Sequence, residues 1–257
     1  MPLRKNLRRK RWQIAIAFIT ILICLLIGVF YFYSSPTLNR TIRFRAFGIA
    51  IPASYSLHGI DVSHYQHRID WAAVSAMRVD SLQLHFSFVK ATEGTGLTDR
   101  QFSRNWDALT RTRLVRGAYH YFRARAGGKI QADHFIRNVR LRSGDLPPVL
   151  DVEELDGATP AQLVTRVREW LHRIEEYYGV KPILYTGVQF YNRYLAAHFS
   201  DYPLWVAHYY QPNAPRTGHR WIFWQHSDLG QVDGIRNRVD FNVFNGSKEE
   251  FDSLRIP

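Results

Sequence analysis

Residues 149–153 read Val-Leu-Asp-Val-Glu, a short apolar run whose end turns acidic. Such a run is typical of a buried strand. Successive residues of a strand point to opposite faces, so Asp151 and Glu153 share one face while Leu150 and Val152 point the other way. Two carboxylates on an inner face are costly to bury unless they have partners or a function. We therefore expect a strand that carries a functional acid pair at its end.

Seven further apolar runs accompany this one, and amphipathic stretches separate several of them. The strands are expected at Gly59–Ser63, Leu84–Ala91, Val115–Phe122, Pro148–Glu153, Pro182–Thr186, Leu204–Tyr209, Trp221–His226 and Val239–Phe244. Helices are expected at Asp99–Thr112, Gly128–Arg142, Thr159–Tyr178 and near Gln189–Ala197. Alternating strands and helices favour a parallel sheet with right-handed crossovers. The pattern predicts an α/β fold, an irregular (β/α) TIM-like barrel with fewer than eight helices, with an open doubly wound sheet as the alternative.

Acidic residues recur at the ends of these strands, where such barrels place catalytic groups. Asp61 lies near the end of the first strand, and Asp240 lies in the eighth. The first and last strands of a closed barrel are neighbours, so Asp61 and Asp240 are expected to meet. Crowding of carboxyl groups raises one pKa and leaves an acid beside a carboxylate, as glycoside hydrolysis requires. Each acid alone could equally cap a helix, but four on one rim favour a catalytic site.

Other classes of chemistry find little support in the sequence. The eleven histidines are scattered without metal-ligand spacing, and Ser63 lies in no G-x-S-x-G motif. We therefore expect no metal and no cofactor. The net charge of +12 is concentrated in residues 1–46, which carry nine basic residues and no acidic ones, so the other 211 residues carry only +3. A nearly balanced domain argues against a nucleic-acid partner.

The N-terminal region predicts a membrane anchor. Ile14–Tyr33 is an apolar run of 20 residues, long enough to cross a bilayer core, and six positive charges precede it. The positive-inside rule places the N-terminus in the cytoplasm, and a cleaved signal peptide is the alternative. The single cysteine, Cys24, lies within this run, so the exported part has no disulfide. We expect a cytoplasmic basic tail at 1–11, a transmembrane signal anchor at 12–33, a spacer at 34–56 and a catalytic domain at 57–257.

Five motifs in order resemble those of glycoside hydrolase family 25 lysozymes over about His58 to Asn245. They are His58-Gly59-Ile60-Asp61-Val62-Ser63-His64-Tyr65-Gln66, Phe88-Val89-Lys90-Ala91-Thr92-Glu93-Gly94, Gly117-Ala118-Tyr119-His120-Tyr121-Phe122, Leu150-Asp151-Val152-Glu153 and Val239-Asp240-Phe241-Asn242. His67 departs from the glycine or proline expected after Gln66, which bears on the shape of that loop.

The resemblance implies N-acetylmuramidase activity on peptidoglycan, at the β-1,4 bond between N-acetylmuramic acid and N-acetylglucosamine. It implies Glu153 as the general acid and base and Asp151 as the residue that orients and stabilises the substrate's N-acetyl group, with retention of configuration. Asp61 and Asp240 would hold this arrangement. The expected sugar contacts are Tyr121, Tyr185 and Gln225. Two alternatives stay open: an inactive wall-binding module, and a hydrolase of another N-acetylhexosamine glycan such as chitin.

Overall fold

The computed structural model describes residues 2–34, 41–211 and 213–257, and the chain divides into two units, Met1–Asn39 and Arg40–Pro257. The first unit is helix α1 (Pro2–Ser34). Its segment Trp12–Val29 has a mean hydropathy of 2.6, and none of it is buried within the protein. By length and composition α1 is able to cross a membrane, although a signal sequence satisfies the same criteria.

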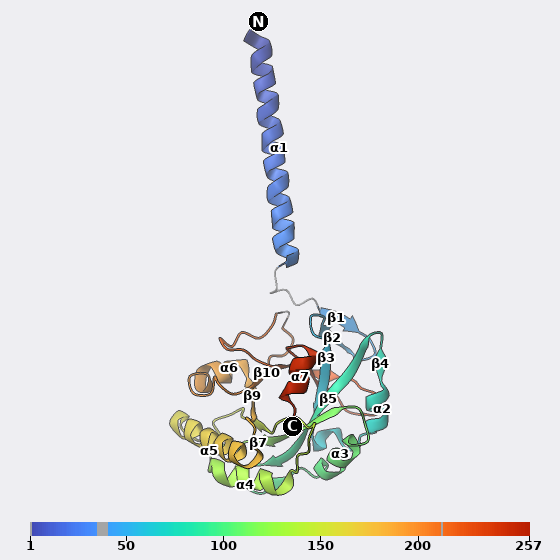
Figure 1. Ribbon diagram of the computed structural model, residues 1–257, viewed down its shortest axis with the longest axis vertical. Coiled ribbons are helices and arrows are strands. Elements are labelled where there is room, and N and C mark those ends of the chain that lie inside the picture. Colours follow the sequence, from blue (N-terminus) through green and yellow to red (C-terminus); the bar gives the residue numbers. More distant parts are fainter. Residues whose placement is uncertain (1, 35–40, 212) are drawn as a thin grey trace. The chain divides into compact units, whose positions relative to one another are not determined.

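Eight strands of the second unit form a closed barrel (Figure 1). In order around the ring they are β3 (Leu57–Val62), β5 (Leu82–Glu93), β7 (Val115–Tyr121), β8 (Val149–Asp151), β9 (Ile183–Gly187), β10 (Leu204–Ala207), β11 (Phe223–Gly230) and β12 (Val239–Phe244). Pairing of β3 with both β12 and β5 closes the ring. The predicted barrel is confirmed, and the open doubly wound sheet is wrong.

Strand β12 departs from the parallel arrangement that strand–helix alternation suggested. It runs antiparallel to both of its neighbours, β11 and β3, whereas the other barrel pairs are parallel. The reason is the connection: a short segment without an α-helix joins β11 to β12, so the chain turns back instead of crossing over. Two-residue strands, β4 (Arg78–Val79) and β6 (Leu97–Thr98), add antiparallel pairs to β5.

Apolar side chains fill the barrel and also separate it from the surrounding helices. Val149 belongs to an inner cluster that includes Trp205, whereas Leu150 and Val152 belong to an outer cluster that includes Trp170. This is the alternation predicted for the strand at 149–153, and it places Asp151 on the inner side.

Helices surround the strands (Figure 1). They are α2 (Trp71–Ala76), α3 (Phe102–Leu109), α4 (Gly128–Asn138), α5 (Pro160–Tyr178), α6 (Val188–Phe190) and α7 (Lys248–Leu254), together with a 3-10 turn, η1 (His64–Gln66), and a π-helical turn, η2 (Tyr191–Leu195). Helix α5 matches its prediction because both end signals act. The Thr159 side chain accepts a hydrogen bond from the Gln162 backbone, and Gly179 ends the helix at φ +70°. Helices α2 and α7 were not predicted, since each is shorter than two full turns.

Part of the expected spacer belongs to the barrel unit. Strands β1 (Thr41–Phe44) and β2 (Ile49–Pro52) form an antiparallel hairpin. Phe47 in its turn is fully buried, its ring contacts Phe241 of β12, and its carbonyl accepts a hydrogen bond from the Gln231 backbone at 2.9 Å. Burial of Phe47 and Ile51 makes this hairpin a cover for one flank of the barrel. The compact unit therefore starts well before residue 57.

Candidate active site

The acid pair of residues 149–153 lies where three parallel strands end together. Asp151 is the last residue of β8, and in register it faces Tyr121 of β7 and Tyr185 of β9. The backbone of Asp151 accepts a hydrogen bond from Phe122 at 2.8 Å. Glu153 follows two residues later, beyond the end of the strand. The ladder therefore fixes the position of Asp151, while Glu153 extends from the rim.

Asp61 and Asp240 are directly opposite each other in the pairing of β3 with β12. Asp61 lies at the C-terminal end of β3, and Asp240 lies at the N-terminal end of β12. Because β12 is antiparallel, its beginning meets the ends of the parallel strands. The meeting of these two acids was predicted, but the prediction treated β12 as parallel, and the direction of the strand corrects that reasoning.

Amide side chains hold Asp61 in place. Its Oδ1 accepts hydrogen bonds from Gln225 Nε2 at 2.8 Å and from Asn242 Nδ2 at 2.7 Å. Asn242 is itself fixed by a 2.8 Å hydrogen bond from Trp205 Nε1. Asn242 ends the motif Val239-Asp240-Phe241-Asn242, from which no role was predicted for it. Its spacing of two residues from Asp240 on one strand was the available signal, since such residues share a face.

Two tyrosines complete this network. The hydroxyl groups of Tyr185 and Tyr209 each donate to Gln225 Oε1 at 2.6 Å. Gln225 is 2% exposed, so its amide chiefly connects the tyrosines to Asp61 and leaves little surface for a sugar. Tyr209 was not among the predicted site residues. Its position beyond the end of β10 makes its contact depend on the fold rather than on any local pattern.

Tyr121 stands at the rim beside charged residues. The ammonium of Lys90 lies 4.7 Å and the guanidinium of Arg123 lies 4.8 Å from its ring centroid. Lys90 Nζ donates to Glu93 at 2.7 Å, and Arg123 Nε donates to the same carboxylate at 2.9 Å. Lys90 and Arg123 thereby balance the negative charge of Glu93. We interpret Glu93 as a residue that shapes the rim and orients Lys90 toward the site.

All seven residues predicted for the site line one cavity of about 210 Å³. They are Asp61, Tyr121, Asp151, Glu153, Tyr185, Gln225 and Asp240. Ser63, Tyr65, Gln66, Lys90, Tyr119, Trp205 and Tyr209 also contribute to the lining, together with Val62. The cavity thus combines carboxyl groups with aromatic rings, the combination that sugar-binding sites use.

Burial and crowding raise the pKa of each carboxyl group in the cavity. Burial, and then the charge of Glu153, raise the pKa of Asp151 well above its ordinary value. The Oδ1 atom of Asp151 has no hydrogen-bond partner among the residues that the structure describes. Glu153 stands at the open mouth, and partial loss of water raises its pKa, while the nearby Tyr185 hydroxyl and the charge of Lys90 oppose that shift.

The carboxyl groups of Asp61 and Asp240 also have raised pKa values. Burial raises the pKa of Asp61 to about 6, against the opposing hydrogen bonds from Asn242 and Gln225. Burial and the charge of Asp61 raise the pKa of Asp240 to about 9. Asp240 therefore holds a proton at neutral pH and shares it with Asp61 through a hydrogen bond. Such a site offers an acid, a carboxylate and a supporting pair of carboxyl groups that share one proton within one cavity.

No group of three or more His, Cys, Asp or Glu side chains that could hold a metal ion occurs among the described residues. The chemistry that the cavity can perform with its own groups is proton transfer and electrostatic stabilisation of a cation. Barrel and site together define a glycosidase.

Comparisons with known proteins agree. A sequence model described as "Glycosyl hydrolases family 25" matches residues 60–235. "Uncharacterized protein YegX" from Escherichia coli (strain K12) is 51% identical over 210 residues, which cover 82% of this chain and 77% of that protein. "Lysozyme M1" from Streptomyces globisporus is 37% identical over 212 residues, 76% of this chain and 70% of that protein.

The solved structure of a family 25 glycosyl hydrolase from Bacillus anthracis superposes with a TM-score of 0.72 at 30% identity, covering 82% of this chain and 99% of that one. The chain belongs to glycosyl hydrolases family 25. At the level of the family, its activity is hydrolysis of peptidoglycan by a glycosidase.

Proposed function

We propose that this chain cleaves the β-1,4 bond between N-acetylmuramic acid and N-acetylglucosamine in peptidoglycan, with Glu153 as general acid and base. The observation that carries the proposal is the convergence of Asp151 and Glu153 with Asp61 and Asp240 in one cavity. Two relatives support the substrate: they are N,O-diacetylmuramidases from Chalaropsis sp and Arthroderma benhamiae, 28% and 25% identical to this chain.

The two acids of the pair take different roles. The charge of Glu153 raises the pKa of Asp151, whereas the hydrogen bond with Asp151 lowers the pKa of Glu153, so over a range of pH the pair holds one proton. In the productive state Glu153 carries that proton and donates it to the glycosidic oxygen as the bond to the anomeric carbon breaks. Glu153 stands at the mouth where a leaving sugar and then water can reach it, and Asp151 lies deeper on the strand.

Asp151 then stabilises positive charge. We infer that the carbonyl oxygen of the substrate's N-acetyl group attacks the anomeric carbon, and that Asp151 accepts the N–H of that group. The unpartnered Oδ1 of Asp151 in the cavity supports this role, because a buried acceptor without a partner favours a donor from the ligand. Glu153, now a carboxylate, takes a proton from water, which opens the cyclic intermediate and restores the acid. Configuration is retained, and NMR of the product showing the inverted anomer would contradict this.

The test is a zymogram on peptidoglycan with the wild type, Glu153→Gln and a matched control, Glu154→Gln. Glu154 is the next residue, but its carboxylate is exposed and pairs with Arg123 at 2.8 Å. Loss of a general acid typically lowers the rate by about 10²–10⁴-fold, so Glu153→Gln should fail to clear and the control should clear normally. Equal clearing by Glu153→Gln would refute the assignment.

Mass spectrometry of the released fragments separates the remaining alternatives. Muramic acid at the new reducing end is expected from a muramidase, whereas a hydrolase of another glycan would leave peptidoglycan intact. A wall-binding module would sediment with peptidoglycan but release no fragments, whichever residue stands at position 153.

We also propose that α1 is an uncleaved anchor that keeps the enzyme on the outer side of a membrane. The support is the apolar segment Trp12–Val29 and the six basic residues that precede it. An enzyme held in this way reaches only the nearby wall, which suits local remodelling. Full-length protein should stay in the membrane fraction with the barrel accessible to protease from outside. Recovery of a shortened, soluble enzyme would overturn the proposal.

A further inference from the structure

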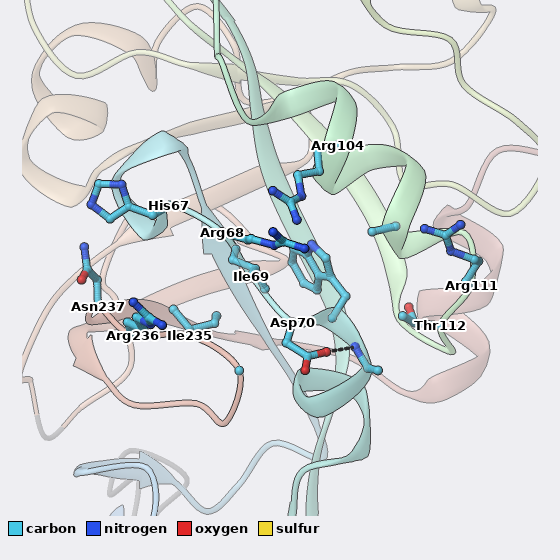
Figure 2. A pocket seen from close by; sticks show the side chains of 14 residues that line it. His67, Arg68, Ile69, Asp70, Arg104, Arg111, Thr112, Ile235, Arg236 and Asn237 are labelled. Atoms are coloured by element: carbon cyan, nitrogen blue, oxygen red, sulfur yellow. Dashed lines mark hydrogen bonds between the residues drawn. The ribbon is translucent and has the colours of Figure 1, made fainter.

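A second hollow has a volume of about 960 Å³, and Figure 2 shows the side chains that line it. Three segments line it: residues 67–72 after η1, residues of α3 and the turn that follows it, and residues 234–237 before β12. Two hydrogen bonds join these segments at the rim, from Gln66 Nε2 to the Arg238 carbonyl at 2.9 Å and from Asn237 Nδ2 to the Tyr65 carbonyl at 2.6 Å. Tyr65 and Gln66 line the acid cavity, and they adjoin His67 and Asn237 of this hollow through the chain and through the second of these hydrogen bonds, so the two hollows are neighbours.

Four arginines line this hollow, namely Arg68, Arg104, Arg111 and Arg236. Within the described part of the chain, none of their guanidinium groups forms a hydrogen bond or an ion pair. Some arginines outside the hollow are paired: Arg116 pairs with Asp145, and Arg173 pairs with Asp133, each at 2.8 Å. Figure 2 shows the guanidinium groups of Arg68 and Arg104 directed toward one another across the hollow.

The lining of the hollow holds little negative charge to balance these four arginines. Asp70 is the one acidic residue among the described residues that line the hollow, and its Oδ1 already accepts the backbone N–H groups of Ala72 and Ala73 at 3.1 and 3.2 Å. Asp107 and Asp233 lie on neighbouring parts of the same segments but do not line it. Gathered positive charges repel one another unless an anion joins them.

Buried apolar residues form the base of the hollow. Ile69, Trp71 and Ile235 are 6%, 3% and 9% exposed. The Trp71 indole N–H donates to Asn105 Oδ1 at 3.1 Å, which fixes the ring. A ligand there would rest on a fixed surface with guanidinium groups around it. Planar guanidinium groups bind carboxylates through two parallel hydrogen bonds, and they bind phosphates in the same way.

We propose that this hollow binds the carboxylate groups of the peptide stems that peptidoglycan carries on its muramic acid residues. The proposal rests on the proposed function, because it assumes that the glycan strand occupies the acid cavity. The adjacency of the two hollows at residues 65–67 and Asn237 favours a ligand covalently linked to that strand over an independent phosphate. The arginines thereby select glycan that still bears its stems.

The binding test uses the full chain in non-ionic detergent carrying Glu153→Gln, which prevents turnover. Calorimetric titration compares a free stem peptide, the same peptide with amidated carboxylates, and inorganic phosphate. We expect Arg68→Gln with Arg104→Gln to weaken binding of the carboxylate peptide about tenfold or more, as loss of charge-assisted hydrogen bonds implies. Arg140→Gln, an exposed arginine outside the hollow, is the matched control and should bind normally.

A second measurement separates this proposal from the proposed function. On stem-bearing peptidoglycan the arginine double variant should raise KM, whereas on glycan stripped of its stems it should equal the wild type, which also shows that it is folded. Equal binding of the amidated peptide, phosphate binding as tight as peptide binding, or unchanged binding by the double variant would each overturn the inference. Failure of the wild type to cleave either glycan would refute the proposed function, while the peptide titration would still decide on the hollow.

Discussion

Replacing Asp240 by asparagine is expected to stabilise the barrel while impairing the site. Burial and the neighbouring charge of Asp61 raise the pKa of Asp240 to about 9, from an ordinary value of 3.8. In the unfolded chain the carboxyl group ionises near that ordinary value. The stability that the folded state draws from holding the proton is therefore complete below about pH 4, and it is lost as the pH rises toward 9.

The magnitude follows from the two pKa values. Between about pH 4 and pH 7 the folded protein keeps the proton and the unfolded chain releases it, so the free energy of unfolding falls by about 1.4 kcal/mol per pH unit. The limit at pH 7 is about 4 kcal/mol. Asparagine cannot ionise, and its amide can donate to Asp61 only through a weaker N–H contact, so we expect a net gain of about 1–3 kcal/mol at pH 7.

The measurement is equilibrium unfolding of the full chain in non-ionic detergent at pH 5, 6, 7 and 8, followed by tryptophan fluorescence. The difference between Asp240→Asn and the wild type should grow with pH, and peptidoglycan clearing should decrease. Asp107→Asn, at an exposed acid of α3, is the control and should show no growing difference. A difference that is the same at pH 5 and pH 8, or a variant less stable than the wild type at pH 8, would refute the reasoning.

Two further predictions concern stability. Arg116 donates to Asp145 at 2.8 and 3.0 Å where both are nearly inaccessible, so Arg116→Met alone should lower the free energy of unfolding by about 3–5 kcal/mol. The double variant with Asp145→Leu should recover much of the lost free energy of unfolding in chemical denaturation. Equal losses in the single and double variants would contradict the explanation that the single variant leaves the buried Asp145 carboxylate unpaired. His67 adopts φ +54° and ψ −134°, a conformation that favours glycine, so His67→Gly should gain about 1 kcal/mol in thermal unfolding. His67→Ala keeps the strain, and an equal gain from it would exclude that explanation.

The loop at His67 keeps its shape although histidine is not the residue that the motif predicts there. The sequence suggested that glycine or proline suits this position, and the backbone has the positive φ that explains a preference for glycine. The loop keeps its shape with histidine because surrounding contacts hold it. Gln66 Oε1 accepts the Ser63 N–H at 2.9 Å, and the His67 N–H donates to the His64 carbonyl at 3.0 Å.

The sequence by itself determined the strand that ends at Asp151, the barrel, and the gathering of acids at its rim. These follow from short-range physics: alternation fixes which residues of a strand face inward, and end signals such as Thr159 and Gly179 fix where a helix starts and stops. The acids stand out because a buried carboxylate is rare without a function.

The tertiary structure alone decided the direction of β12, the place of the hairpin at 41–52, and the partners of each acid. Asp61 meets Gln225 and Asn242 across 164 and 181 residues of sequence, and no local pattern encodes such a contact. The arginine hollow is likewise built from three separate segments. Long-range pairing is set by how the whole sheet closes, so the acid pair at 149–153 was visible in the sequence, whereas the surroundings that set its pKa values existed only after folding.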